Sequence, residues 1–171
     1  MPLLKFGEFV EDDWVALIDG ESLPQGSDVI VPFERLVEDI DTLKAHNGSL
    51  GVAFPNDASI EDLKPYLANL DVVVLSFPAF GDGRAYSQAK KLKSQLGFSG
   101  EIRASGNVLP DQFAFMRQCG FNAFDVPDRQ SLDAWQQSAT SMTVAYQRGF
   151  GPERGFAPEN ALDRRKEYFD D

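Results

Sequence analysis

Short runs of apolar, β-type residues alternate five times with segments in which apolar residues recur at helical spacing. This alternation constrains the fold more than any other feature of the chain. The β-type runs lie at residues 29–32, 50–54, 72–77, 101–105 and 123–126. Each connection is long enough for a helix that returns the chain to the same edge of a sheet. The pattern predicts an α/β protein with a mainly parallel sheet of about five strand–helix units.

The segments between these runs place their apolar side chains on one helical face. A Ser59 N-cap opens the second of them, and Pro65 should kink or delay the helix there. A short buried helix is expected around Phe113, Met116 and Cys119. Helices are therefore predicted within residues 33–43, 59–70, 84–96, 113–119 and 132–146.

The two ends of the chain depart from this pattern. Residues 4–10 and 14–18 have the character of short strands joined by an acidic turn, which predicts an antiparallel hairpin within residues 1–20. With that hairpin included, residues 1–148 are expected to form a single domain. Residues 149–171 are rich in Gly, Pro and charge, which predicts a mobile tail.

The run EIRAS distinguishes between two sheet architectures. Its alternation places Glu101, Arg103 and Ser105 on one face of a strand. In an open doubly wound sheet both faces lie under helices, where a buried Glu and Arg are costly unless they are paired. A barrel interior can satisfy such groups. We therefore expect a TIM-barrel-like partial barrel, with a flavodoxin-like open sheet as the alternative if this is an edge strand.

Charge and residue usage narrow the classes of function. The chain has 27 acidic and 16 basic residues and a formal net charge of −11, which disfavours nucleic acid or an anionic membrane as a partner. A basic leader and a long apolar run are both lacking, so a cytoplasmic protein is expected. Cys119 and His46 are the only residues of their types, and no metal site is expected. No G-x-G-x-x-G follows a predicted strand, so the sequence names no cofactor.

Ligands of parallel α/β proteins collect at the carboxyl ends of the strands. In this chain the loops at those ends are residues 54–58, 76–87, 105–111 and 126–131. The second contains Asp82, Gly83 and Arg84 at the start of a predicted helix, followed by Tyr86 and Ser87. An arginine in the first helical turn opposes the helix dipole, so it favours an anionic partner.

The next loop adds Ser105, Gly106 and Asn107 between a strand and a helix, where free N–H groups form an anion site. Both loops also have a purely structural interpretation. Asp82 or Asn107 can cap a helix, and the glycines can supply turn conformations. Under the binding interpretation, Arg84 and Arg103 face one anion-binding mouth in which Asp82 orients the donors.

The run FPAFGDGRAYSQAKKLKSQLGFSGEIRASGNVLPDQFAFMRQCGFNAFDV resembles the core of a bacterial family known as domain of unknown function 934. Members of that family read close to FPxFxDGRxYSQAxxLRxxxGFxGExRAxGDVLxDQxxFxxRCGFDAF. The chain departs from the family pattern at Asn107, where Asp is common, and at Pro110, where a basic residue is frequent. The motif positions it shares are Asp82, Gly83, Arg84, Tyr86, Ser87, Gln88, Glu101, Arg103, Gly106, Asp111, Gln112, Cys119 and Gly120.

The resemblance implies a role in sulfur assimilation and cysteine biosynthesis, because genes of this family typically lie beside the gene of the sulfite reductase hemoprotein. It implies an accessory protein, as scaffold or electron-transfer partner of that hemoprotein, with a small-anion site at the mouth. The alternative is an oxidoreductase-like enzyme acting on an anionic substrate. In such an enzyme Asp82 or Glu101 would be the general acid or base and Tyr86 a proton donor, while Arg84 and Arg103 would hold the substrate.

Overall fold

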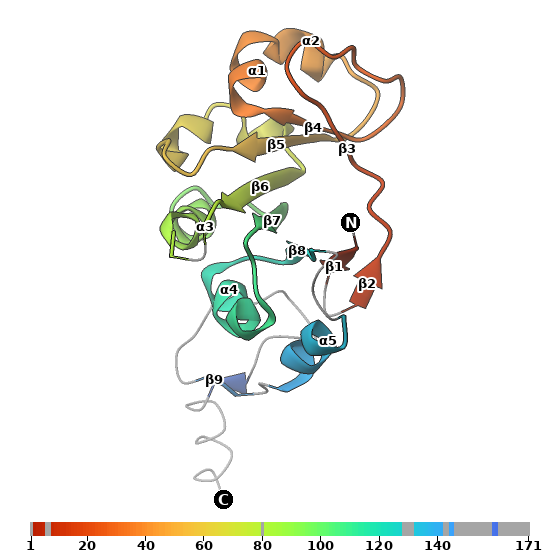
Figure 1. Ribbon diagram of the computed structural model, residues 1–171. Coiled ribbons are helices and arrows are strands. Elements are labelled where there is room, and N and C mark those ends of the chain that lie inside the picture. The colour runs from red at the N-terminus through yellow and green to blue at the C-terminus, as the bar shows by residue number, and fades with distance from the viewer. Residues whose placement is uncertain are drawn as a thin grey trace, which may run out of the picture.

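The computed structural model describes residues 2–5, 8–79, 81–127, 132–141, 144–145 and 159–160. These residues form an eight-stranded, mostly parallel sheet that curls into a half-barrel with helices along its outer face (Figure 1). The strand order is β2-β1-β8-β7-β6-β5-β4-β3. The predicted partial barrel is therefore confirmed, and the open flavodoxin-like sheet is not what the chain forms.

All five predicted β-type runs are strands of this sheet. They pair in parallel, with each strand beside the next one along the chain. Most residues of these strands are buried, which explains the agreement with the predicted ranges. β4, β5 and β6 are nearly continuous apolar runs, and β7 alternates charged with apolar residues. The strands are β4 (Val29–Pro32), β5 (Leu50–Phe54), β6 (Val72–Phe77), β7 (Glu101–Gly106) and β8 (Ala123–Asp125).

The N-terminal hairpin is present, but its two strands differ from those predicted. It consists of β1 (Leu3–Lys5) and β2 (Glu8–Val10), which pair antiparallel, and β1 also pairs antiparallel with β8. The second predicted strand, β3 (Val15–Ala16), instead pairs in parallel with β4 at the opposite edge of the sheet. Local alternation predicted the strands but not their partners, because the acidic turn after β2 spans the open side of the half-barrel.

Two predicted helices are broken. The first divides at Asp39, whose backbone angles (φ −109°, ψ 17°) leave the helical region, into α1 (Phe33–Glu38) and α2 (Ile40–Lys44). The second consists of two 3₁₀ helices, η1 (Ile60–Leu63) and η2 (Leu67–Asn69), on either side of Pro65. Proline lacks the N–H that a continuous helix would need there, so the predicted effect of Pro65 is confirmed in a stronger form.

The remaining helices are α3 (Arg84–Ser94), η3 (Pro110–Gln112), α4 (Phe113–Cys119) and α5 (Leu132–Ser141). Gly120 ends α4 at φ +111°, a left-handed conformation that favours glycine. The last helix is shorter than predicted, because β9 (Val144–Ala145) follows α5 and pairs in parallel with β10 (Glu159–Asn160). Tyr146 and, apart from β10, the predicted tail lie outside the described residues.

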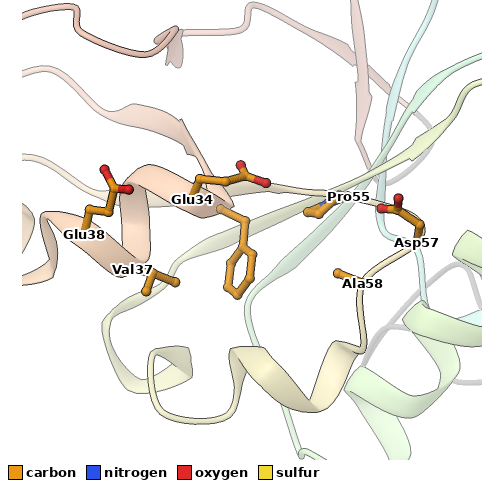
Figure 2. A pocket seen from close by; sticks show the side chains of 7 residues that line it. Glu34, Val37, Glu38, Pro55, Asp57 and Ala58 are labelled. Carbon is orange, nitrogen blue, oxygen red and sulfur yellow. The ribbon is translucent and has the colours of Figure 1, made fainter.

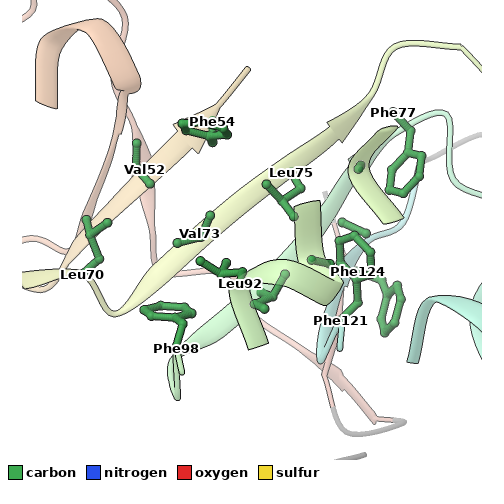
Figure 3. Close-up of a cluster of buried hydrophobic side chains, with 14 of the residues drawn as sticks. Val52, Phe54, Leu70, Val73, Leu75, Phe77, Leu92, Phe98, Phe121 and Phe124 are labelled. Atoms are coloured by element: carbon green, nitrogen blue, oxygen red, sulfur yellow. The ribbon is translucent and has the colours of Figure 1, made fainter. Parts of the chain in front are cut away.

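The main core lies between the outer face of the sheet and the helices (Figure 3). Strand residues such as Val73 and Leu75 are fully buried against Leu92 of α3. Aromatic rings extend this core toward α4, where the ring centroids of Phe77 and Phe121 lie 5.7 Å apart. The core thereby fixes the starts of α3 and α4 beside the carboxyl ends of β6 and β7.

The inner face of the half-barrel carries a smaller apolar cluster. Ile30, Val72 and Val74 are buried there beneath Trp14. Gly51 lies between them, and a Cβ at this position would come within 3.3 Å of the Trp14 ring and 2.9 Å of Ile30. The segment that joins β2 to β3 therefore covers part of the inner face. Among the described residues, no helix is long and apolar enough to span a membrane.

Candidate functional site

The loops that follow β6 and β7 are neighbours, as the sequence predicts, because these strands are hydrogen-bonded side by side. Asn107 connects the two loops. Its backbone N–H donates to the Phe77 carbonyl at 2.7 Å, and its side-chain Nδ2 donates to the Pro78 carbonyl at 2.9 Å. Gly106 has φ +89°, and a Cβ there would lie 2.6 Å from the same Phe77 carbonyl. Gly106 and Asn107 thus hold the mouth of the half-barrel together.

Asp82 and Arg84 form a two-pronged ion pair at the start of α3. Arg84 Nε donates to Asp82 Oδ1 at 3.0 Å, and Nη2 donates to Oδ2 at 2.7 Å. The Arg84 backbone N–H also donates to Oδ1 at 3.2 Å, so the carboxylate closes the turn through Gly83. The Asp82 side chain is 16% exposed and that of Arg84 is 56% exposed. Asp82 therefore caps the start of α3, as the structural interpretation predicts, and the Arg84 side chain still faces solvent.

The ion pair fixes the protonation state of Asp82. Hydrogen bonding from Arg84 lowers the Asp82 pKa to about 2, and a hydrogen bond from Asn56 adds to this effect. The same pairing raises the pKa of Arg84. A carboxylate that stays ionised far below neutral pH is a poor general acid or base. Asp82 therefore holds the loop, and its charge orients Arg84.

Gln88 and Asn56 connect the turn of Asp82, Gly83 and Arg84, the DGR turn, to the loop after β5. Asn56 Nδ2 donates to Asp82 Oδ2 at 2.8 Å. Gln88 is buried, and its Nε2 donates to the carbonyls of Pro55 and Ala58 at 3.0 and 3.1 Å. The family motif identified Gln88, whereas Asn56 was missed because asparagine after a strand is ordinary turn composition.

Tyr86 belongs to an aromatic cluster between α3 and α4. Its ring lies 5.0 Å from that of Phe77 and 4.9 Å from that of the exposed Phe115. Burial raises the pKa of the half-buried phenol, and the charges of Cys119 and Asp111 add to the increase. The hydroxyl therefore keeps its proton. Ser87 is exposed on the same helix.

The remaining candidates of the β7 loop have local structural contacts. The Gln112 side chain accepts a hydrogen bond from the Leu109 backbone N–H at 3.2 Å, which caps η3. Asp111 is exposed and lines a groove of about 570 Å³ between η3 and α5. Ser105 faces the inner side of the sheet next to Ser76, and both are half-buried. Burial raises the pKa of the Cys119 thiol, which suits the predicted core position.

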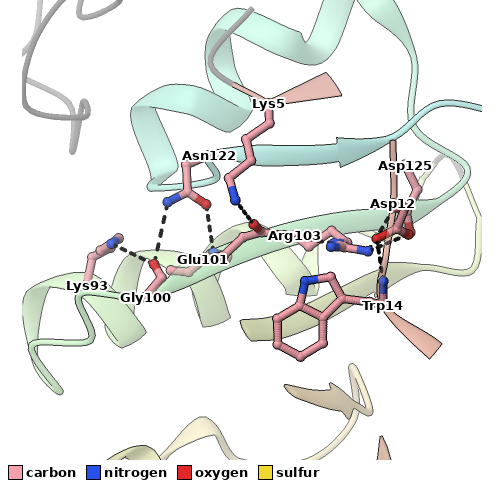
Figure 4. Close-up of polar contacts among 10 residues, drawn as sticks. Lys5, Asp12, Trp14, Lys93, Gly100, Glu101, Arg103, Asn122 and Asp125 are labelled. Atoms are coloured by element: carbon pink, nitrogen blue, oxygen red, sulfur yellow. Dashed lines mark hydrogen bonds and ion pairs between the residues drawn. The ribbon is translucent and has the colours of Figure 1, made fainter. Parts of the chain in front are cut away.

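Glu101 and Arg103 form a buried ion pair on the inner face, as their alternation predicts (Figure 4). Arg103 Nε donates to Glu101 Oε1 at 2.9 Å, and the side chains are 2% and 6% exposed. Lys5 Nζ lies 2.7 Å from the other Glu101 oxygen. Arg103 Nη1 also donates to Asp12 Oδ2 at 2.8 Å and lies 3.8 Å from Asp125 Oδ1.

The two arginines proposed for one mouth therefore have different surroundings. Arg84 is exposed at the helix start and pairs with Asp82, whereas Arg103 is enclosed by three carboxylates. Burial alone would lower the Arg103 pKa, but its acidic neighbours raise it. The sequence could not reveal Lys5, Asp12 and Asp125 as partners, because they lie on segments far from β7 in the chain.

Asp125 has the most perturbed carboxyl in this cluster. Its pKa is raised to about 6, mainly by burial; the charge of Arg103 opposes the increase, and the charges of Asp12 and Glu101 add to it. The folded protein thus binds this proton more tightly than the unfolded chain, whose Asp pKa is about 4. Stability from this group is present below about pH 4 and is lost as pH rises through about 6.

We expect Asp125→Asn to raise the unfolding free energy at pH 7.5, by on the order of 2 kcal/mol, and to change it little at pH 4. The reason is that an amide at position 125 carries no charge to bury. Urea unfolding of both proteins at the two pH values measures the difference. Equal gains at both pH values would show that the effect does not come from ionisation.

Comparison with known proteins places this site within a family. A family model described as a bacterial protein of unknown function (DUF934) matches residues 51–156, which is more than half of the chain. The match includes the DGR turn, Gln88, the Glu101–Arg103 pair and the Gly106–Asn107 turn. No curated protein matches the chain.

Proposed function

The chain belongs to the bacterial family known as domain of unknown function 934, and from this premise we propose that it is an accessory protein of assimilatory sulfite reduction. In this role it docks on the sulfite reductase hemoprotein as a scaffold or electron-transfer partner, in the cytoplasm. The family match is the observation that carries the proposal, since the resemblance of residues 77–124 implies that pathway. The net charge of −11 supports docking on a basic partner surface.

The state of the carboxylates supports an accessory role over a catalytic one. Asp82 is held ionised by Arg84. Glu101 is buried between Lys5 and Arg103, which use both of its oxygens. The two residues named for general acid or base chemistry are thus engaged in holding structure.

A small-anion site at Arg84 is part of the proposal. Nε and Nη2 of its guanidinium pair with Asp82, and the side chain is 56% exposed. Asp82 fixes the orientation of the planar group, which reduces the entropy lost when a second acceptor binds on the open side. Sulfite and sulfate offer acceptor oxygens that suit a guanidinium.

We expect a deletion strain to grow poorly on sulfate or sulfite and to recover on cysteine or sulfide. An Arg84→Ala copy should fail to restore growth on sulfate, because the proposed anion contact is lost while the fold is kept. Growth rates on each sulfur source measure both effects. Lys90→Ala is the matched control, since it removes an exposed cation from the same helix.

Normal growth of the deletion strain on sulfate, with no duplicate gene present, would contradict the proposed pathway. Full complementation by Arg84→Ala would instead contradict the anion site alone: the proposed pathway would still hold, and the DGR turn would serve only to start α3. Affinity purification from sulfate-grown cells gives an independent result. Recovery of the sulfite reductase hemoprotein would support the accessory role.

One observation favours the oxidoreductase-like alternative. Tyr86 keeps its proton, its ring packs against the exposed Phe115, and it follows the exposed Arg84 by two residues in the first turn of α3. A proton donor in the same helical turn as an anion-binding cation is a reasonable start for catalysis on an anionic substrate. Purified protein that copurifies with no partner, yet converts an added small anion, would favour this alternative.

A further inference from the structure

A groove of about 550 Å³ lies between α1 and the loop that follows β5, apart from the DGR turn (Figure 2). Its floor is apolar and is formed by Phe33, Val37, Pro55 and Ala58. The Phe33 ring is fixed edge-on against Phe54 at 4.8 Å. Val37 is 44% exposed, a large value for an apolar helix residue beside the core. The floor can therefore accept one apolar side chain of a ligand.

Three exposed carboxylates surround this floor. Glu34 and Glu38 come from α1, and Asp57 lies across the groove on the loop after β5 (Figure 2). Among the described residues none of the three has an ion-pair partner. Arg84 exerts only a longer-range attraction on Asp57. The one cation of α1, Arg35, has other partners: it donates to the carbonyls of Ile18 and Glu21 and lies 3.6 Å from Asp39.

Helix stability does not explain Glu38. It is the last residue of α1, where a negative charge opposes the helix dipole. It also follows Glu34 by four residues, and like charges at this spacing repel each other. An exposed valine between two such carboxylates adds a further apolar cost. A ligand that neutralises the carboxylates and covers Val37 would remove all three penalties.

We infer that this groove binds a basic segment of a partner protein. An apolar side chain of that segment lies on Phe33 and Val37, and flanking Lys or Arg side chains pair with Glu34, Glu38 and Asp57. Charge complementarity and the apolar floor select this occupant, because a nucleic acid or an anionic ligand would be repelled. The inference rests on the proposed accessory function for its biological meaning, and it names the chemistry of the docking partner.

The test uses the full chain and a fluorescein-labelled peptide, Gly-Ser-Lys-Arg-Leu-Arg-Lys-Ser-Gly, followed by fluorescence anisotropy. We expect the Glu34→Gln, Glu38→Gln double variant to weaken binding about threefold to tenfold. Val37→Ser, or Ser in place of Leu in the peptide, should weaken it about threefold or more. The matched control is Glu8→Gln with Glu11→Gln, which removes the same charge from exposed positions at the other edge of the sheet.

Loss of binding in the groove variants with the control unchanged would support the inference. The Glu34→Gln, Glu38→Gln variant should stay folded, because it removes a repulsion within α1. Equal weakening in the control pair would overturn it, because the attraction would then be non-specific. Indifference to the Leu-to-Ser change would overturn it in favour of a simple cation site. Self-association of the chain that the groove variants abolish would overturn it in favour of a second copy. None of these outcomes depends on sulfur-source growth, so the proposed pathway can fail separately.

Discussion

Arg103→Ala should lower the free energy of unfolding by about 3 kcal/mol, which is at the lower end of the cost of breaking a buried ion pair. Arg103 is 2% exposed and serves Glu101, Asp12 and Asp125 together. Without it, Asp12 and Asp125 lose their ion-pair partner. Lys5 still neutralises part of the Glu101 charge, which limits the loss. Urea unfolding at pH 7 measures the change.

Arg84→Ala is the matched control for this prediction. It removes the same side chain from an ion pair whose arginine is 56% exposed and whose Asp82 keeps the hydrogen bond from Asn56, so its unfolding midpoint should stay close to that of the parent. The double variant Glu101→Gln, Arg103→Met should recover part of the stability, because it removes a buried charge of each sign. A midpoint for Arg103→Ala that matches the parent would mean that the cluster does not hold the N-terminal segment in place.

Phe121→Ala should cost about 3–5 kcal/mol, the usual range for removing a buried aromatic ring. Phe121 is 1% exposed, and its ring lies 5.7 Å from that of Phe77 and 6.4 Å from that of Tyr86. The substitution leaves a cavity where the core meets the start of α3. Thermal and urea unfolding both report the loss.

Phe115→Ala provides a control within the same aromatic cluster. Its ring also contacts Tyr86, at 4.9 Å, but Phe115 is 54% exposed. The same substitution should therefore change stability little. If the two variants lost equal stability, burial would not be the cause of the effect.

The sequence predicted those parts of the fold that depend on neighbouring residues. Apolar runs marked β4, β5, β6 and β8, and alternating charged and apolar residues marked β7, because a side chain buried in the sheet must be apolar or paired. It was wrong about the first helix, since the apolar spacing continues through Asp39 although the backbone does not. It also paired Trp14 and its neighbours with the first hairpin, because strand partners depend on the whole topology.

The candidate site was also predictable only where the residues are neighbours in the sequence. Alternation in β7 was enough to predict that Glu101 and Arg103 share a face and pair there. The carboxylates that complete their surroundings come from the turn after β2 and from β8, and no spacing connects them to β7. The groove beside α1 was also missed, because FERLVE has the composition of an ordinary surface helix.

The strand order also determines when the protein can be completed during synthesis. β1 leaves the ribosome before the other strands of the sheet, yet its partner β8 belongs to the last strand–helix unit of the sheet. The hairpin of β1 and β2 can join the sheet only after nearly the whole domain has been synthesised, and strand pairs so distant in the chain form slowly. Until β1 pairs with β8, the exposed edges of both strands can pair with strands of other chains and cause aggregation. Asp12 and Arg103 are 91 residues apart in the chain, so the ion cluster can be completed only after the N-terminal segment has reached β7.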